Sequence, residues 1–385
     1  MRCRSCGGPT SPLLDLGEQP LANRLLSSPD EPYEKYPLHL MICNVCNLGQ
    51  LEYFVPPKKM FTDYVYYTSV SGPSVDSAKE LVSSITVPDN ALVVEIGSND
   101  GYLLQFYKER GIATLGIDPA HGPAEAAYAK GIMTIKDYFT AELARHLPQA
   151  DIIHANNVLA HVPDLNDFVA GLAIMLKPGG SCYIEVPYLE HLLRNCEFDT
   201  IYHEHHYYFS FQSLRELFNR HGLHIAYVQH LEAHGGSIRL RVGTMESGFT
   251  MLEKINQYRD KFQSKVDHIS LNLKASITSL VRNNKVVWGF GAAAKATVML
   301  NYCGIRNDLI PVVVDETPVK IGKYIPGTGI KVVHPDEWLL KQPDYTCLFA
   351  WNYYKMIQDR YSTSYHGTFF TPYNLESLKE KVKCL

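Results

Sequence analysis

The pattern of hydrophobic and polar positions changes near residue 75. Residues 1–75 are rich in Pro, Tyr and Cys and show little helical periodicity, although the apolar stretch 38–42 predicts a strand that enters a cysteine turn. Beyond residue 75, apolar runs with the length of a buried strand alternate with helical patterns. The predicted order is helix 77–85, strand 91–96, helix 102–110, strand 114–118, helix 124–130 and strand 151–155. This alternation predicts a parallel, doubly wound α/β sheet.

A second unit with the same order follows. A predicted strand at 235–242 closes the first unit, and residues 251–283 carry a long amphipathic helical pattern that suits a bridge between domains. The second unit then reads as strand 285–288, tight turn 289–291, helix 292–300 and strand 310–315, which ends in an acid. We therefore divide the chain into four segments: 1–75, 76–245, a helical linker at 246–284, and 285–385.

Composition narrows the class of protein. The chain has 385 residues, of which 46% are hydrophobic and 20% charged, so it is globular and too long for one ordinary core. The net charge of −4 argues against a nucleic-acid partner held by phosphate contacts. No apolar run approaches a membrane span, and the start lacks the apolar segment of a secretory signal. We expect a cytoplasmic protein whose nine cysteines are thiols or metal ligands.

Four of the cysteines form two CxxC pairs, Cys3 with Cys6 and Cys43 with Cys46. Two thiolates on one tight turn can both reach one ion, and two such turns give the tetrahedral sulfur coordination that suits zinc. Four protein ligands leave no open position on the metal, so the expected Zn²⁺ is structural. The alternative is chance spacing of reduced thiols.

The first glycine turn has the features of a methyl-donor site. Glu95, Gly97 and Asn99 lie between a predicted strand and a helix, Asp118 ends the next strand, and a later strand ends in Asn156-Asn157. Glycine allows close approach of a ligand, and an acid at a strand end can accept hydrogen bonds from ribose hydroxyls. The turn lacks the full GxGxxG spacing, so S-adenosylmethionine is favoured over a dinucleotide. The alternative is an ordinary β–α turn.

The second glycine turn is closer to a dinucleotide fingerprint. Gly289 and Gly291 are followed by Ala292, and Ala294 occupies the third glycine position before Lys295. The following helix N-terminus suits a phosphate. Three interpretations stay open on spacing alone: a site for the diphosphate of a sugar nucleotide, NAD binding by a dehydrogenase, and a turn that only packs helix on sheet.

The stretch Tyr202-His203-Glu204-His205 gathers titratable side chains downstream of the first glycine turn. A neutral imidazole is available near neutral pH and can remove a proton from a carbon beside a ketone. Alternatives are a second metal site, because His203 and His205 alternate, or a solvated polar turn.

Together these motifs resemble the S-adenosylmethionine-dependent nucleotide-sugar C-methyltransferases. The resemblance covers nearly the whole chain and includes Ala155-Asn156-Asn157-Val158-Leu159-Ala160-His161-Val162. It implies an α/β fold with an N-terminal zinc-binding module, a central Rossmann-like methyl-donor domain and a C-terminal Rossmann-like domain. It also implies methylation at C-3 of a nucleotide-linked 4-keto-6-deoxy sugar, with dTDP as the favoured nucleotide, bound between the second and third domains.

The resemblance also implies roles for single residues. His205 matches the general base, while Glu204, Tyr202 and His161 match residues that line the sugar pocket. Tyr66 matches a tyrosine from the segment after the zinc module. Gly291, Ala292 and Lys295 would then contact the sugar nucleotide.

Other functions are also compatible with these motifs. O- or N-methylation of a similar sugar would use the same base on a hydroxyl or amine. An NAD-dependent dehydrogenase would use the Gly289 turn. A zinc-ribbon interaction protein without activity is disfavoured by the intact Gly97, Asp118 and His205.

Overall fold

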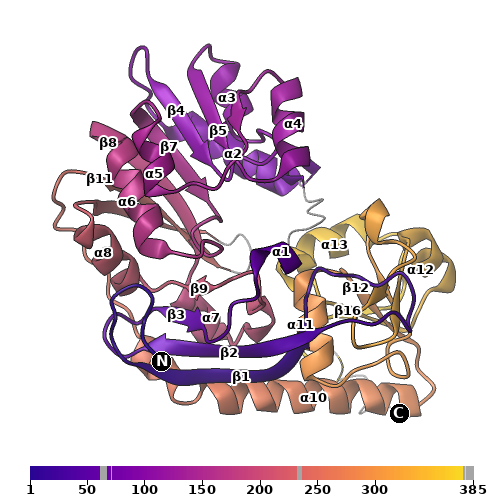
Figure 1. Ribbon diagram of the computed structural model, residues 1–385. Coiled ribbons are helices and arrows are strands. Elements are labelled where there is room, and N and C mark those ends of the chain that lie inside the picture. Colours follow the sequence, from indigo (N-terminus) through magenta and orange to yellow (C-terminus); the bar gives the residue numbers. More distant parts are fainter. Residues whose placement is uncertain (61–66, 71, 232–235, 376–377, 379–385) are drawn as a thin grey trace.

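The computed structural model describes residues 1–60, 67–70, 72–231, 236–375 and 378. Within these residues the strands form three sheets, and Figure 1 shows each sheet in a separate part of the molecule. The predicted α/β class, with an N-terminal cysteine cluster ahead of Rossmann-like units, is confirmed.

The N-terminal part is a long antiparallel hairpin. Its sheet has the order β1-β2-β3-β9. The elements are β1 (Thr10–Pro20), β2 (Lys35–Cys43), β3 (Gly49–Leu51), the short helix α1 (Pro57–Met60) and β9 (Tyr207–Tyr208). Strand β9 belongs to the middle of the sequence, and it pairs antiparallel with β3. The N-terminal sheet therefore holds the chain immediately after the His205 stretch.

The central sheet has the order β10-β11-β8-β7-β4-β5-β6. Its strands are β4 (Leu92–Ile96), β5 (Ala113–Ile117), β6 (Thr134–Ile135), β7 (Ala150–Asn156), β8 (Leu176–Pro187), β10 (His224–Leu231) and β11 (Ser237–Gly243). Its helices are α2 (Gly72–Ser84), α3 (Leu104–Lys108), α4 (His121–Ala129), α5 (Ala141–Arg145), α6 (Leu165–Met175), α7 (Leu189–Asn195) and α8 (Phe211–Arg220).

The sequence pattern predicted a parallel sheet, but the central sheet is parallel only in part. Strands β8 to β6 are parallel, but β11 runs antiparallel to both β8 and β10. Only residues 232–236 separate β10 from β11, and a parallel pair would need a crossover of a dozen residues or more. The antiparallel edge follows from this short connection.

The C-terminal sheet has the order β14-β15-β13-β12-β16-β17. Its strands are β12 (Val287–Phe290), β13 (Val312–Val314), β14 (Tyr324–Ile325), β15 (Ile330–Val333), β16 (Tyr345–Leu348) and β17 (Thr368–Phe370). Its helices are α11 (Ala294–Tyr302), α12 (Pro335–Lys341) and α13 (Tyr354–Tyr361). The predicted turn at 289–291 is too long, because Gly289 belongs to β12 and only Gly291 has a positive φ, +93°.

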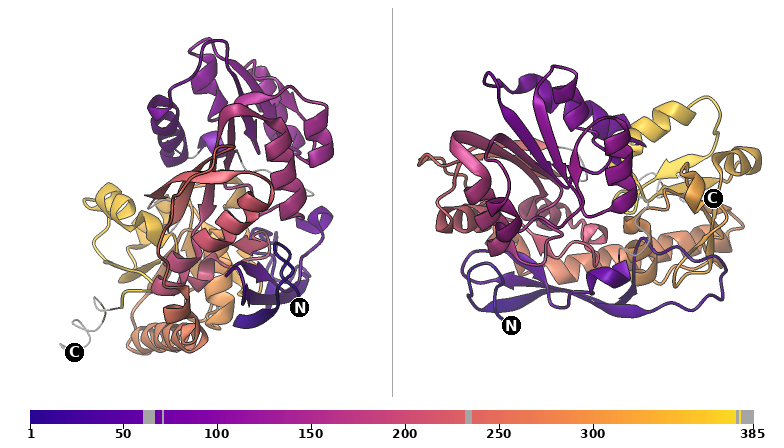
Figure 2. Two further views of the ribbon diagram at one scale, coloured as in Figure 1. Left: turned by 90° about the vertical axis from the view of Figure 1, so that its left-hand side faces the viewer. Right: turned by 45° about the horizontal axis from the view of Figure 1, so that its top comes forward.

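Helix α10 (Phe262–Arg282) connects the parts, preceded by the short helix α9 (Ile255–Arg259). Phe262, Val266, Leu273, Ile277 and Leu280 recur at helical spacing and are buried. They share one apolar core with the N-terminal hairpin and the C-terminal sheet. Figures 1 and 2 show α10 running beside the hairpin along one side of the molecule. No helix among the described residues is long and apolar enough to cross a membrane.

Candidate active site

The four predicted zinc ligands come together at one end of the hairpin. The sulfur atoms of Cys3, Cys6, Cys43 and Cys46 all lie within 4.8 Å of one another. The Cys3–Cys46 and Cys6–Cys43 sulfurs are 3.7 and 3.5 Å apart. Tetrahedral zinc with Zn–S bonds of about 2.3 Å places sulfurs about 3.8 Å apart, so the spacing fits Zn²⁺.

Backbone amides support the same cluster. The N–H groups of Val45 and Cys46 both donate to the sulfur of Cys43 at 3.4 Å, and that of Gly8 donates to Cys6 at 3.4 Å. Such donors stabilise negative charge on the sulfurs that a metal needs. Among the described residues, no second group of this kind gathers, so the alternative of a metal site at His203 and His205 finds no support.

The predicted methyl-donor residues meet at the carboxyl edge of the central sheet. Asp118 accepts the N–H of Asn99 and the N–H of Ala120, both at 2.8 Å. Gly97 has φ +67°, and a Cβ there would come within 2.4 Å of Val158. Glycine is therefore required at this position by both conformation and space.

The same edge carries buried polar atoms that fit a polar ligand. Glu95 Oε2, Ser98 Oγ and Asn156 Oδ1 have no hydrogen-bond partner among the described residues. Burial raises the pKa of Glu95 well above its ordinary value, and the nearby Asp118 adds to the effect. A carboxyl group and an amide oxygen suit the ammonium group of S-adenosylmethionine. A buried acceptor without a partner costs free energy, and the N–H groups of the ligand would supply the missing hydrogen bonds.

Asn157, in contrast, already has a partner. Its side-chain amide donates to Glu185 Oε1 at 3.1 Å, and Glu185 is bonded at 2.9 Å to the buried Arg239. Neither Glu185 nor Arg239 was predicted from the sequence. Arg239 shows no periodic or motif signal, and it reaches the site only because β11 pairs with β8.

The predicted sugar-site residues gather in one cluster. Tyr202 Oη lies 3.0 Å from His205 Nε2, and the His161 and His205 rings are 4.8 Å apart in a T-shaped contact. His161 Nδ1 is bonded at 2.7 Å to the backbone oxygen of Glu204. Tyr66 lies outside the described residues, so its predicted position has no structural counterpart here.

The hydrogen bond of His161 fixes what its ring offers to a ligand. A carbonyl oxygen only accepts, so Nδ1 carries the proton and a neutral ring presents a lone pair at Nε2. Burial lowers the pKa of His161, which keeps the ring neutral. In this state His161 accepts a hydrogen bond and does not donate one to an enolate oxygen.

The neighbouring histidines are part of the packing. His203 is buried, with Nε2 3.2 Å from the backbone oxygen of Tyr36. His206 stacks on Phe54 at 3.9 Å, and burial lowers its pKa to about 4. The ring of His205, in contrast, lies against those of Tyr202 and His161.

One loop connects the methyl-donor edge to His161 of the cluster. Strand β7 ends at Asn156, and the loop after it runs from Asn157 to His161, whose N–H donates to the Val158 oxygen at 2.8 Å. Ala160 of this loop accepts the N–H of His206 at 2.8 Å, and β9 then pairs with β3. Hydrogen bonds thus tie the donor edge, the His205 stretch and the N-terminal sheet together.

The second glycine turn repeats the geometry of the first. Gly291 N donates to the Val314 oxygen at 2.7 Å, as Gly97 N does to Ile117, and Ala292 N donates to Asp315 at 2.9 Å. However, Lys320 pairs with Asp315 at 3.1 Å, and a Cβ on Gly291 would meet Ala350 at 2.7 Å. The acid that a dinucleotide ribose would need already has a cation, which disfavours NAD.

Lys295 lies in a group of polar and aromatic side chains, of which only Lys295 itself was predicted from the sequence. Its Nζ is 3.2 Å from Asn352 Oδ1 and 4.1 Å from the centre of the Trp351 ring. Asp199 is buried nearby and accepts from Trp351 Nε1 at 2.8 Å and Tyr373 Oη at 2.5 Å. Burial raises the pKa of Asp199 to about 6. The one feature of the sequence that could have pointed to Asp199 is its position three residues before Tyr202.

Comparison with known proteins agrees with this arrangement. Residues 3–61 match a zinc binding domain, residues 78–228 a methyltransferase domain, and residues 232–373 a C-methyltransferase C-terminal domain. The chain is 33% identical over 383 residues to C-methyltransferase NovU of Streptomyces niveus, covering 93% of this chain and 91% of that protein. The chain belongs to the C-methyltransferase family. It is an S-adenosylmethionine-dependent C-methyltransferase with a zinc-binding domain.

More distant similarities are confined to part of the chain. The ubiquinone biosynthesis O-methyltransferase of Pseudomonas fluorescens (strain SBW25) is 31% identical over 97 residues, which are 24% of this chain and 42% of that protein. The magnesium protoporphyrin IX methyltransferase ChlM of Synechocystis PCC 6803, solved with bound SAM, is 17% identical with a TM-score of 0.34, covering 44% of this chain and 77% of that chain. Membership of the C-methyltransferase family decides against the dehydrogenase alternative and favours carbon over oxygen or nitrogen as the methylated atom.

Proposed function

We propose that this C-methyltransferase methylates C-3 of a nucleotide-linked 4-keto-6-deoxy sugar after His205 removes the proton from that carbon. The observation that carries the proposal is the loop after β7. Strand β7 ends in Asn156 of the methyl-donor edge, and the loop continues from Asn157 to His161, whose ring packs against His205. A base beside a methyl-donor site is what carbon methylation requires, because the carbon must first become a nucleophile.

Proton removal and stabilisation of the enolate are assigned to different residues of the cluster. S-adenosylmethionine, when bound, supplies an electrophilic methyl group. His205 accepts the proton from the carbon beside the ketone, and the electron pair of the broken C–H bond is delocalised onto the ketone oxygen. The Tyr202 hydroxyl can rotate from His205 Nε2 to that oxygen, which frees the base and stabilises the enolate in the same movement.

Two further side chains suit binding of the sugar. His161 presents a lone pair that can accept a hydrogen bond from a sugar hydroxyl. Burial raises the pKa of Glu204, while a hydrogen bond from Asn23 opposes the rise. A carboxyl group held in this way can bind a hydroxyl or an amine beside the reacting carbon.

The C-terminal part suits the nucleotide, for which we favour dTDP. The N–H groups of Gly291 and Ala292 are already bonded, but helix α11 begins after Ala293 without a side-chain cap, so the N–H groups of its first turn suit a ligand. Burial lowers the pKa of Lys295, and the negative charge of a diphosphate would favour its protonated form. Both features support a diphosphate site at this helix N-terminus.

A labelled-methyl assay tests the proposal. The enzyme is incubated with nucleotide-linked 4-keto-6-deoxy sugars and S-adenosylmethionine carrying ¹³C in its methyl group. We expect a product heavier by one CH₂ group, with carbon–carbon coupling between the label and the ring carbon beside the ketone. Coupling to no ring carbon, as for methyl on oxygen or nitrogen, would contradict the proposal.

A further inference from the structure

The connection between β1 and β2 carries residues of the zinc-binding domain to the sugar-site cluster. It leaves β1 at Pro20, far along the hairpin from the cysteines, and contacts the C-terminal part at two points. Thr297 Oγ1 donates to the Ala22 oxygen at 2.9 Å, and Leu26 exchanges two backbone hydrogen bonds of 2.8 Å with Tyr324. Ala22 and Leu26 are buried, so the segment between them is anchored at both ends.

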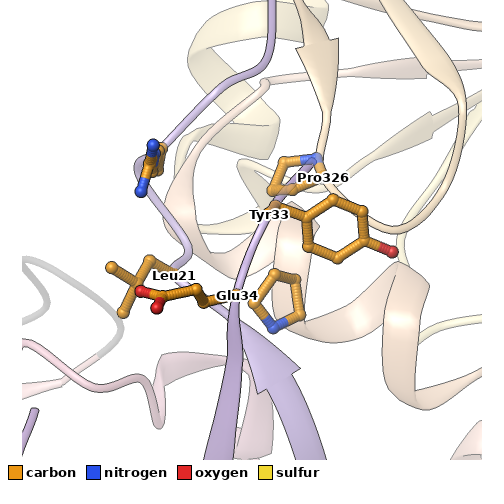
Figure 3. A pocket seen from close by; sticks show the side chains of 6 residues that line it. Leu21, Tyr33, Glu34 and Pro326 are labelled. Carbon is orange, nitrogen blue, oxygen red and sulfur yellow. The ribbon is translucent and has the colours of Figure 1, made fainter. Parts of the chain in front are cut away.

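Figure 3 shows the same junction from close by. Leu21, Tyr33 and Glu34 of the connection line a shallow hollow together with Pro326 of the C-terminal part. The contact between the two parts therefore extends beyond the two anchors. It fixes the position of the residues between them.

Asn23 is the residue that this anchored segment presents to the cluster. Its Nδ2 donates to Glu204 Oε1 at 2.7 Å, although 181 positions separate the two residues in the sequence. Asn23 is exposed and Glu204 is only partly buried, so a ligand can still reach both. Glu204 directly precedes His205, and its backbone oxygen holds His161.

We infer that Asn23 is a positioning residue of the sugar site, contributed by the zinc-binding domain, which acts by orienting the Glu204 carboxylate toward the bound sugar. The inference rests on the proposed function for the identity of the ligand. An amide NH₂ donates to a carboxylate and leaves the second carboxylate oxygen for the ligand. The zinc-binding domain thus has a role in substrate binding in addition to its role in folding.

The surroundings of Glu204 make this contact measurable. The Glu204 backbone oxygen is bonded to His161, Tyr202 is bonded to His205, and Arg24, next to Asn23, acts electrostatically on Glu34. Burial raises the pKa of Glu204, and the Asn23 amide lowers it. Loss of the amide should therefore raise this pKa further.

The test compares Asn23→Ala with the control Gln263→Ala. Gln263 Oε1 accepts the N–H of Asp15 at 2.8 Å, so the control removes a contact between the same hairpin and α10 without touching Glu204. The first measurement needs no substrate: an infrared pH titration of the Glu204 carboxyl group, assigned with Glu204→Gln. We expect a transition at higher pH in Asn23→Ala and an unchanged transition in the control. An unchanged transition in Asn23→Ala would overturn the inference.

The second measurement is a double-mutant cycle on methyl transfer. Asn23→Ala should lower kcat/KM roughly tenfold, the scale of one hydrogen bond to a charged group. The variant with both Asn23→Ala and Glu204→Gln should be no slower than Glu204→Gln alone, because Asn23 acts through Glu204. Losses that multiply would overturn the inference. If the wild-type enzyme methylates no keto-sugar nucleotide, the proposed function fails, while the infrared titration still decides on Asn23.

Discussion

At the scale of single residues, burial sets the protonation state of the site. Burial raises the pKa of Glu95 and of Asp118 and lowers that of His161. The acids thus shift toward neutral carboxyl groups and the imidazole toward its neutral form. Such groups are costly in the empty protein and become useful when a cationic methyl donor or a sugar supplies the missing partner.

Glu95→Gln should stabilise the empty protein while weakening the binding of S-adenosylmethionine. The folded-state pKa of Glu95 lies above its ordinary value. As the pH rises through the ordinary pKa, the unfolded chain releases the proton of Glu95 while the folded chain keeps it. Wild-type stability therefore falls relative to the variant as the pH rises from acid toward neutral. We expect a gain in the free energy of unfolding of about 1–3 kcal/mol near neutral pH.

Urea unfolding of both proteins over a pH series, together with calorimetric binding of S-adenosylmethionine, checks this expectation. Equal stability of the two proteins at every pH would contradict the assigned role of Glu95 burial. Asp151→Asn is a suitable control, because Asp151 lies at the opposite end of the sheet and is paired with Lys177 at 2.7 Å.

At the scale of elements, two β–turn–α units repeat one hydrogen-bond pattern. Both sheets also place their strands around the first strand of the unit in the same order, β5-β4-β7 in one and β13-β12-β16 in the other. The sequence predicted both units, because a buried strand followed by glycine and a helix leaves a local signal. The break between α9 and α10 was not predicted, since the amphipathic pattern continues across Asp260.

The zinc cluster is the element whose removal should have the largest effect on folding. Cys43→Ser should reduce bound zinc from about one ion per chain to little or none and lower the melting temperature, because metal binding supplies folding free energy to a small segment. Cys303→Ser, which changes a buried thiol in the C-terminal part, should keep its zinc. Elemental analysis and thermal unfolding measure both effects. Full zinc content in Cys43→Ser would contradict the assignment.

At the scale of the whole molecule, the site that we propose draws residues from three parts. The N-terminal hairpin contributes Asn23, the central part His161, Tyr202 and His205, and the C-terminal part Lys295. One apolar core runs through the hairpin, α10 and the C-terminal sheet. This shared core holds segments far apart in the sequence against each other.

Lys295→Met should weaken binding of a nucleoside diphosphate about tenfold or more, because a charge-assisted contact to phosphate is lost. Binding of S-adenosylmethionine should be unchanged, since the predicted donor residues lie on the central sheet. Lys274→Met on the exposed face of α10 is the matched control. Isothermal titration with the nucleoside diphosphate alone gives its affinity for the wild type and for each variant. Equal affinities in Lys295→Met and wild type would remove Lys295 from the proposed nucleotide site.

The residues that sequence reasoning identified are those within local motifs. The cysteine pairs and the first glycine turn carry spacing that dictates geometry, and the His205 stretch carries a family pattern. Asn23, Asp199 and Arg239 were missed because their partners lie far away in the sequence. Asn23 reaches Glu204, and Asp199 reaches Trp351, only after three sheets have packed. Whether a histidine is exposed or stacked, as for His206 on Phe54, also depends on tertiary contacts.

The most direct test is solvent deuterium exchange at the sugar carbon beside the ketone, measured without methyl donor. We predict exchange in the wild-type enzyme and a loss of about 100-fold or more in His205→Asn, with S-adenosylmethionine binding nearly intact. His161→Asn should retain much of the exchange, because its Nδ1 only anchors the ring and its lone pair binds a hydroxyl. Exchange at the wild-type rate in His205→Asn, or its loss in His161→Asn alone, would contradict the account.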